Sequence, residues 1–199
     1  MATLSYMPAI AAEDMPAIFT HADARSRGVS DRVLYGWRDR GQVEQLARGI
    51  FVQPDLPADP DLVEVAVRAP DATLCLATAL ARHGLIDDIP PTIDIALPRS
   101  RRAPRTTAPV AWHRFDEDTF NIGRDEITVY GELMIGIYDA RRSIVDAFRL
   151  RHLFGEDLAV DAVRRWLAGR GNQPAELLDA ARHFPTAEPS LRRVLQVLL

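Results

Sequence analysis

The chain contains no lysine, and all 24 of its basic residues are arginine. This absence excludes several kinds of active site, because arginine stays protonated and cannot replace a titratable amine. The excluded sites are the lysines of P-loop proteins, of Schiff-base enzymes, of protein kinases, of penicillin-binding enzymes and of common nucleases. A genome-wide codon preference for arginine is an alternative explanation of the bias, and the exclusion holds under either cause.

Cysteine and long apolar runs are also scarce. The single cysteine, Cys75, lies in the run ATLCLATAL, where we expect a buried structural thiol, and no disulfide within the chain is possible. No run approaches the ~18 apolar residues of a membrane helix, and the N-terminal MATLSYMPAIAAEDMP lacks the features of a signal peptide. With 199 residues and 47% hydrophobic content, we expect a cytoplasmic globular protein of one large or two small domains without membrane association.

Residues suited to catalysis are scattered along the chain. The five histidines show no His-x-x-x-His or Cys/His spacing, so the sequence predicts no metal site. The carboxylates of FDEDTF and GRDE fit a solvated turn better than a magnesium site. Because a Gly-x-Ser-x-Gly elbow and a phosphate-cradling glycine loop are also missing, we assign no catalytic residue and no cofactor.

The N-terminal quarter of the chain predicts two short helices and a hairpin. Thr20 and Asp23 fit a capping box, and Gly28 suits the left-handed position after a helix. Ser30 suits the N-cap of a second helix that runs to about Arg40.

Two β-prone runs follow, at 43–46 and 50–52, and they are joined around Arg48-Gly49. Helix, tight turn, helix and hairpin is the order of elements in a winged helix-turn-helix. The proline- and aspartate-rich stretch PDLPADPD then marks a linker. We therefore expect a DNA-binding domain at 1–57 and a second domain at 58–199.

The second domain is expected to be α+β. The sequence predicts helices over 61–69 and 71–83, the second of them central to a core, and a half-buried strand in TIDIALP. Further strands are expected at 110–115, 126–130 and 133–138. From about residue 139, apolar residues at helical spacing predict a C-terminal helical bundle.

The stretch 28–54 concentrates four arginines in a chain with a net charge of −4. On a helical wheel Val33, Leu34 and Trp37 face the core, whereas Arg32 and Tyr35 face outward with Arg38 on the flank. An ordinary amphipathic helix with a solvated polar face would show the same spacing. In a helix-turn-helix this helix enters the major groove, where arginine pairs with guanine. The expected DNA contacts are Arg27, Ser30, Arg32, Tyr35, Arg38, Arg40 and Arg48.

Charge limits how strongly one copy could hold DNA. Arginines and carboxylates are equal in number over the first 54 residues, so nonspecific attraction to phosphate should be modest. A second basic patch lies in PRSRRAPR, a loop expected after a strand. Contact with DNA, contact with an acidic protein partner and a solvated loop are all open interpretations of this patch. Its members are Arg99, Arg101, Arg102 and Arg105.

Three segments in this order resemble a known family: FTHADARSRGVSDRVLYGWRDRGQVEQLARGIFVQP, ATLCLATALARHGLIDDIPPTIDIALPRSRRAP and YDARRSIVDAF. The chain is similar, to about residue 150, to the AbiEi antitoxins of bacterial toxin–antitoxin and abortive-infection operons. The resemblance implies an N-terminal winged helix-turn-helix that represses its own operon, and a C-terminal antitoxin domain. It places the DNA-binding role on residues Ser30 to Arg40 and on the Arg48-Gly49 wing.

We therefore expect an antitoxin and autorepressor with two partners. One is operator DNA with inverted repeats upstream of its own operon, bound by two molecules as a homodimer. The other is a nucleotidyltransferase-like toxin. An enzyme that neutralises the toxin by covalent modification, such as an atypical phosphotransferase, and an antitoxin acting by direct complex formation are the competing hypotheses.

Overall fold

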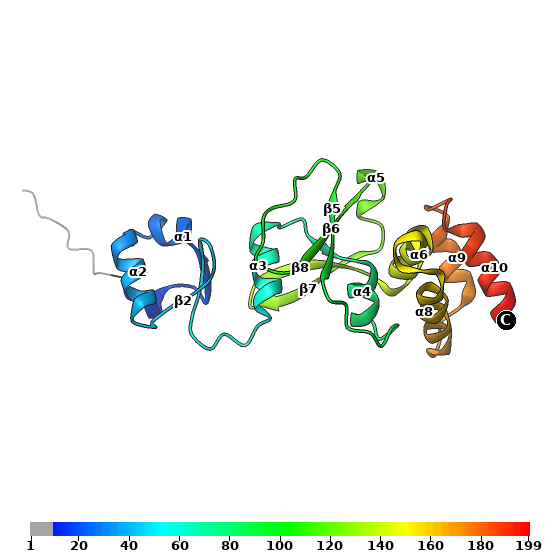
Figure 1. Ribbon diagram of the computed structural model, residues 1–199, viewed down its shortest axis with the longest axis horizontal. Coiled ribbons are helices and arrows are strands. Elements are labelled where there is room, and N and C mark those ends of the chain that lie inside the picture. Colours follow the sequence, from blue (N-terminus) through cyan, green and yellow to red (C-terminus); the bar gives the residue numbers. More distant parts are fainter. Residues whose placement is uncertain (1–9) are drawn as a thin grey trace, which may run out of the picture.

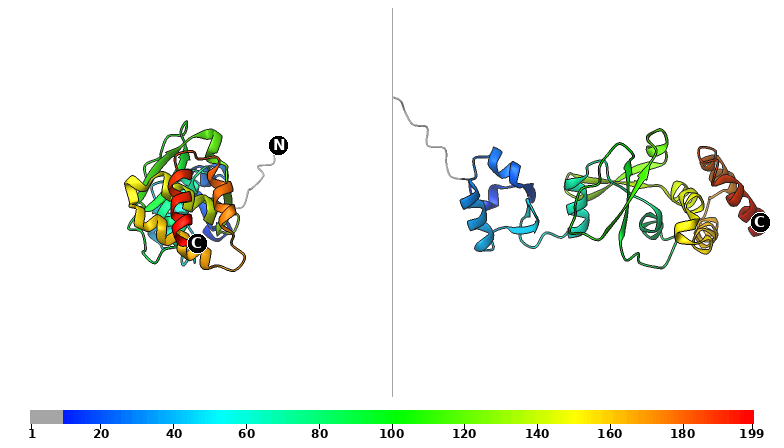
Figure 2. Two further views of the ribbon diagram at one scale, coloured as in Figure 1. Left: turned by 90° about the vertical axis from the view of Figure 1, so that its right-hand side faces the viewer. Right: turned by 45° about the horizontal axis from the view of Figure 1, so that its top comes forward.

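The computed structural model describes residues 10–199 and shows a mixed α+β protein with two sheets (Figure 1). Most of the stretch used to exclude a signal peptide lies outside the described residues. In the described part of the chain, no helix is both long and apolar enough to cross a membrane. Along the longest axis, an N-terminal unit, a central sheet and a group of C-terminal helices follow one another (Figures 1 and 2).

The N-terminal unit is built from short elements. Its strands pair antiparallel in the order β1-β3-β2, and β1, formed by Ile-Phe-Thr directly before a helix, was not predicted from the sequence. The elements are a 3-10 turn (Ala12–Asp14), β1 (Ile18–Thr20), α1 (His21–Ser26), α2 (Asp31–Asp39), β2 (Glu44–Ala47) and β3 (Ile50–Val52).

Local capping chemistry forms both helices as the sequence predicts. Thr20 and Asp23 make the reciprocal capping box, with the Asp23 amide donating to Thr20 Oγ1 at 3.1 Å. Gly28 takes a φ of +82°, which a residue with a side chain rarely adopts, and Ser30 caps α2. The chain therefore turns within three residues and places α2 across the small sheet.

One prediction for α2 is wrong. Leu34 and Trp37 are buried in the core of this unit, but Val33 is 42% exposed. Val33 lies beyond Trp37 on the helix circumference, about 100° from Leu34. Tyr35, about 100° from Leu34 in the other direction, contacts Phe51 of β3, so the sheet lies toward the Tyr35 side of α2 and Val33 remains at the solvent edge.

The second sheet is mixed and has the strand order β6-β5-β4-β8-β7. The pairs β5/β6 and β4/β8 are parallel, whereas β4/β5 and β7/β8 are antiparallel. A helix over Pro60–Arg68, α3, packs on one face of this sheet. The strands are β4 (Thr73–Leu74), β5 (Ile93–Pro98), β6 (Val110–Phe115), β7 (Arg124–Tyr130) and β8 (Leu133–Tyr138).

Three predictions for this part of the chain need correction. The apolar run expected as one helix over 71–83 divides into β4 and α4 (Leu76–Arg82), since an apolar run without periodicity fits a buried strand as well as a buried helix. Strand β5 is buried rather than half-buried, because α3 covers its Ile95 face and α4 its Asp94 face. Both acidic stretches expected as solvated turns lie in regular elements: FDEDTF contains a short helix, α5 (Glu117–Phe120), and GRDE forms the start of β7.

The C-terminal part consists of helices packed around α6 (Ala140–Arg149), which contacts α4 as well as its helical neighbours. Their shared core includes Ile144, Phe148, Trp166 and Leu191. Gly or Pro lies near the breaks at 155, 169–173 and 182–187, as the sequence suggests, whereas the break at Leu150 has neither. The remaining helices are α7 (Arg151–Phe154), α8 (Glu156–Ala168), α9 (Pro174–Ala181) and α10 (Glu188–Leu198).

Candidate nucleic-acid interface

The hairpin tip and both N-terminal helices are tied together at His21. The backbone amide of His21, the first residue of α1, donates to the Gly49 carbonyl in the hairpin turn at 2.9 Å. Its ring Nε2 lies 3.0 Å from Oδ1 of Asp31, the first residue of α2. The start of α1 therefore fixes the position of the hairpin tip relative to the N-terminus of α2.

Three of the predicted DNA contacts have guanidinium groups that are not held by a hydrogen bond or an ion pair. Arg27, Arg32 and Arg48 are exposed, and their side chains make no hydrogen bond or ion pair within the part of the chain that is described. Arg32 belongs to the first turn of α2, and Arg48 to the hairpin turn. Arg27 is close enough to Asp23 to contribute to the lowered pKa of that carboxyl, whereas Arg32 and Arg48 can meet a phosphate or a base edge without first leaving an internal partner.

Arg38 is different because its guanidinium is already bound. Its Nε and Nη2 donate to Asp39 at 3.0 and 2.8 Å, and its Nη1 donates to Gln45 on β2 at 3.1 Å. The same group lies 4.8 Å from the centre of the Tyr35 ring, and that ring packs edge-on against Phe51. Arg38 must exchange the Asp39 carboxylate for DNA before it can pair with guanine.

The remaining predicted residues of this face are also engaged. Arg40 donates through Nε to Gln42 at 2.9 Å. The Ser30 hydroxyl accepts from the Val33 amide as an N-cap, so the helix itself uses this oxygen. The structure thus divides the predicted contacts into three unpaired arginines and a set that is held by neighbouring side chains or backbone.

The second basic patch lies in the loop between β5 and β6, which we call the arginine loop (residues 99–108). Arg99 pairs with Asp116 at 3.0 Å, and Arg101 pairs with Asp71 at 2.8 Å. Arg102 and Arg105 are exposed and make no ion pair among residues 10–199. Half of the charge of the patch is therefore neutralised internally.

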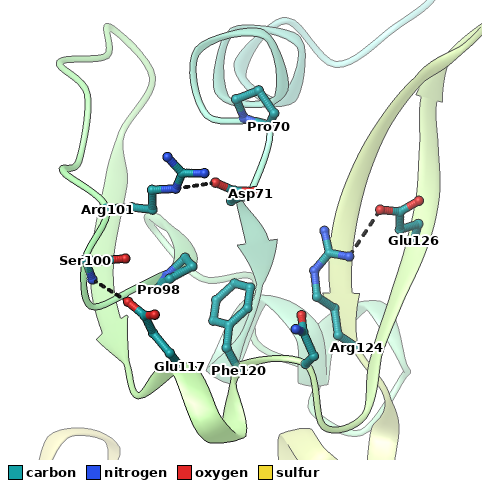
Figure 3. Close-up of a pocket in the computed structure, with 10 residues that line it drawn as sticks. Pro70, Asp71, Pro98, Ser100, Arg101, Glu117, Phe120, Arg124 and Glu126 are labelled. Atoms are coloured by element: carbon teal, nitrogen blue, oxygen red, sulfur yellow. Dashed lines mark hydrogen bonds and ion pairs between the residues drawn. The ribbon is translucent and has the colours of Figure 1, made fainter.

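A cavity of about 420 Å³ opens beside the start of this loop (Figure 3). The ion pair of Arg101 with Asp71 and that of Arg124 with Glu126 lie on its two sides, with Phe120 between and below them. Glu117 accepts from the Ser100 amide at 3.2 Å, and hydrogen bonding from Ser100 lowers the pKa of that carboxyl. Each guanidinium facing the cavity thus already has a carboxylate partner.

The charge of this lining limits what the cavity can do. Two arginines and three carboxylates give a net charge of −1, which disfavours a phosphate-bearing ligand. The other titratable groups point to structural roles: His113 pairs with buried Asp94 at 2.8 Å, and burial raises the pKa of Cys75 well above its usual value. No cluster of ligands suited to a metal ion occurs within residues 10–199.

Sequence reasoning missed several residues that shape these sites. Gln45 and Asp39 bind Arg38, and Asp71 binds Arg101 across a gap of 30 positions in the sequence. Arg68 and Glu64 are spaced as a helical i,i+4 pair, a signal that was available, although their further contacts were not predictable.

Comparison with known proteins adds no identification. No model of a protein family matches the chain, and no curated protein matches it. The resemblance to the AbiEi antitoxins consequently rests on the quoted sequence segments.

Proposed function

We propose that the protein binds double-stranded DNA through α2 and the β2–β3 hairpin, acting together as a winged helix-turn-helix. The observation that carries the proposal is the division of α2 into two faces. Leu34 and Trp37 are buried, whereas the unpaired Arg32 is exposed on the same helix, and Arg48 is exposed on the hairpin that follows. Unpaired arginines on a helix and an adjacent hairpin suit a major groove and its flanking phosphates.

The contacts should divide by type. In the helix-turn-helix mode the N-terminal residues of the second helix contact base edges, which assigns base contact to Arg32. Arg48 would contact phosphate or the minor groove from the hairpin. Arg38 reads a base only after releasing Asp39, so its contribution carries the cost of breaking an ion pair.

We further propose that the protein is an antitoxin that represses its own operon and neutralises a nucleotidyltransferase-like toxin. The AbiEi resemblance supports this role, with residues 1–57 as the DNA-binding domain and 58–199 as the antitoxin domain that ends in a helical bundle. The balanced charge of the N-terminal unit favours two copies on an inverted repeat, because two copies double the few phosphate contacts that one can make.

The proposal is tested with a reporter placed behind the DNA directly upstream of the protein's own gene. Wild type should repress the reporter and protect an inverted repeat from nuclease, and the triple variant Arg32→Ala, Arg38→Ala, Arg48→Ala should do neither. Arg82→Ala, at an exposed arginine without an ion pair in residues 10–199, serves as the matched control. Equal repression by the triple variant would contradict the interface.

The antitoxin role is tested separately by co-expression. The product of the gene adjacent to this one should arrest growth when it is expressed by itself. It should not arrest growth when this protein is co-expressed. Growth arrest that persists in the presence of the protein would contradict the role, and so would an adjacent product that is harmless.

A further inference from the structure

A side chain from α3 reaches the tip of the β2–β3 hairpin. Arg68 donates through Nη2 to the carbonyl oxygen of Arg48 at 3.0 Å. Its Nε donates at the same time to Oε1 of Glu64, one helical turn earlier, at 2.7 Å. The planar guanidinium thus holds two acceptors in a fixed relative position, which a flexible ammonium could not do equally well.

Both carbonyls of the hairpin turn are therefore bound. The Gly49 carbonyl accepts from the His21 amide within the N-terminal unit, and the Arg48 carbonyl accepts from Arg68 outside it. The turn makes few other contacts. Arg48 is exposed, and no atom lies within 4 Å of the position that a Cβ atom on Gly49 would occupy. Without the Arg68 contact, the turn would keep only the first of these two hydrogen bonds, the one from His21.

Glu64 is an unusual anchor because only 3% of it is exposed. Burial by itself raises its pKa, but hydrogen bonds from Ala108, Arg68 and Thr107 outweigh burial and leave the pKa lowered. The amides of Thr107 and Ala108 each donate to Oε2 at 2.9 Å. The carboxylate is thus charged and joined to the end of the arginine loop.

The arginine loop is attached near α3 at two places. Arg101 pairs with Asp71 just beyond the end of α3, and Thr107 and Ala108 bind Glu64 within it. Figure 1 shows α3 between the N-terminal unit and the central sheet. One helix consequently connects the arginine loop to the hairpin tip through a chain of hydrogen bonds.

We propose that Arg68 is a positioning residue for the DNA interface, and that Glu64 links the arginine loop to the hairpin tip through it. The proposal rests on the proposed DNA binding for its functional consequence. Arg68 orders the Arg48 backbone before DNA arrives, so less freedom is lost on binding. A partner that moves the arginine loop would then alter the DNA interface.

Hydrogen exchange of the full-length free protein tests the link without DNA. Arg68→Ala should speed exchange at the His21 amide, which donates to the hairpin turn, and leave Thr107 and Ala108 unchanged because Glu64 still binds them. Glu64→Gln should speed exchange at all three amides, since a neutral amide accepts more weakly and its NH2 group repels Arg68. Arg82→Ala should change none of them.

Two exchange results would overturn the proposal. One is an unchanged His21 amide in Arg68→Ala, and the other is a change confined to Thr107 and Ala108 in Glu64→Gln. Arg68 is only partly buried, so the Arg68→Ala arm stands alone if the Glu64 variant does not fold.

A double-mutant cycle on DNA binding tests the functional consequence. Arg68→Ala should weaken binding to the upstream DNA about two- to tenfold in the wild-type background, the effect of one side chain left unordered. It should have little effect when Arg48→Ala is already present. Equal losses in both backgrounds would mean that Arg68 contacts DNA itself, and no loss in either would mean that it positions nothing. Failure of wild type to bind would instead contradict the proposed function, while the exchange experiment would still decide the link.

Discussion

Replacing Arg142 by methionine should destabilise the protein more than any surface change, because this arginine is the charged centre of a buried cluster. It is 2% exposed, and its Nε donates to the fully buried Asp146 at 2.9 Å. Its Nη1 donates to the carbonyls of Thr119 and Ile122 at 2.7 and 2.6 Å. The guanidinium thereby joins α6 to the segment around α5.

The expected loss in the free energy of unfolding depends on the buried polar groups that lose Arg142 as a partner. Removing one partner of a buried ion pair costs about 3–5 kcal/mol, and the Ile122 carbonyl left without its donor adds on the order of 1 kcal/mol, whereas the Thr119 carbonyl still accepts from the Ile122 amide at 3.2 Å. Arg149 still donates to Asp146 at 3.0 Å, and methionine fills part of the space between the Tyr138 and Phe184 rings, which offsets some of this. We expect a net loss of about 4 kcal/mol.

Urea denaturation followed by circular dichroism measures the loss. The double variant Arg142→Met, Asp146→Leu should recover about 2 kcal/mol of it, because the buried carboxylate that has lost one of its two guanidinium partners is removed as well. A single variant that loses less than about 1 kcal/mol would refute the reasoning, and so would a double variant whose losses simply add.

Three further changes test other parts of the account. Leu34→Ala should cost about 2–4 kcal/mol in the free energy of unfolding and Val33→Ala less than about 1 kcal/mol, and equal costs would contradict the observed burial. Because the pKa of Glu64 is lowered on folding, its contribution to stability is present above the ordinary pKa of 4.5 and is lost as the pH falls through the lowered pKa. In urea titrations, the free energy of unfolding should therefore decrease less below pH 4.5 for Glu64→Gln than for wild type. Asp39→Asn should free Arg38 and tighten binding to the upstream DNA about threefold at low salt, measured by gel shift, and unchanged or weaker binding would mean that Arg38 does not reach DNA.

Local chemistry made the N-terminal unit the most predictable part of the fold. The capping box of Thr20 and Asp23, the left-handed Gly28 and the turn at Gly49 depend on residues close in sequence, and the structure has each of them. Strand β1 was missed because three residues before a helix are too few to show alternation.

The second sheet was less predictable because its burial is decided by distant segments. Whether 71–83 forms one helix or a strand and a helix depends on pairing of β4 with β5 and β8, which lie far along the chain. Strand β5 alternates like a half-buried strand, yet α4 covers its second face. The spacing of apolar residues indicates which secondary structure a segment favours, but it does not indicate which distant segment packs against it.

The same limit applies to the candidate interface. Sequence located the arginines on the correct elements but could not show that Asp39 and Gln45 bind Arg38 while Arg32 stays unpaired. The spacing of Glu64 and Arg68 predicts an ion pair within a helix. It does not predict that the pair joins the hairpin tip to a loop more than 50 residues further along the chain.

Fluorescence anisotropy with a labelled duplex from upstream of the gene tests the central claim most directly. The double variant Arg32→Ala, Arg48→Ala should bind at least tenfold more weakly than wild type, since losing one base contact alone costs about 1–3 kcal/mol. The dependence of the affinity on salt should also become less steep, because Arg48 no longer neutralises a phosphate. Arg82→Ala should bind like wild type. A double variant that binds as tightly as wild type, with the same salt dependence, would contradict the assignment of DNA binding to α2 and the hairpin.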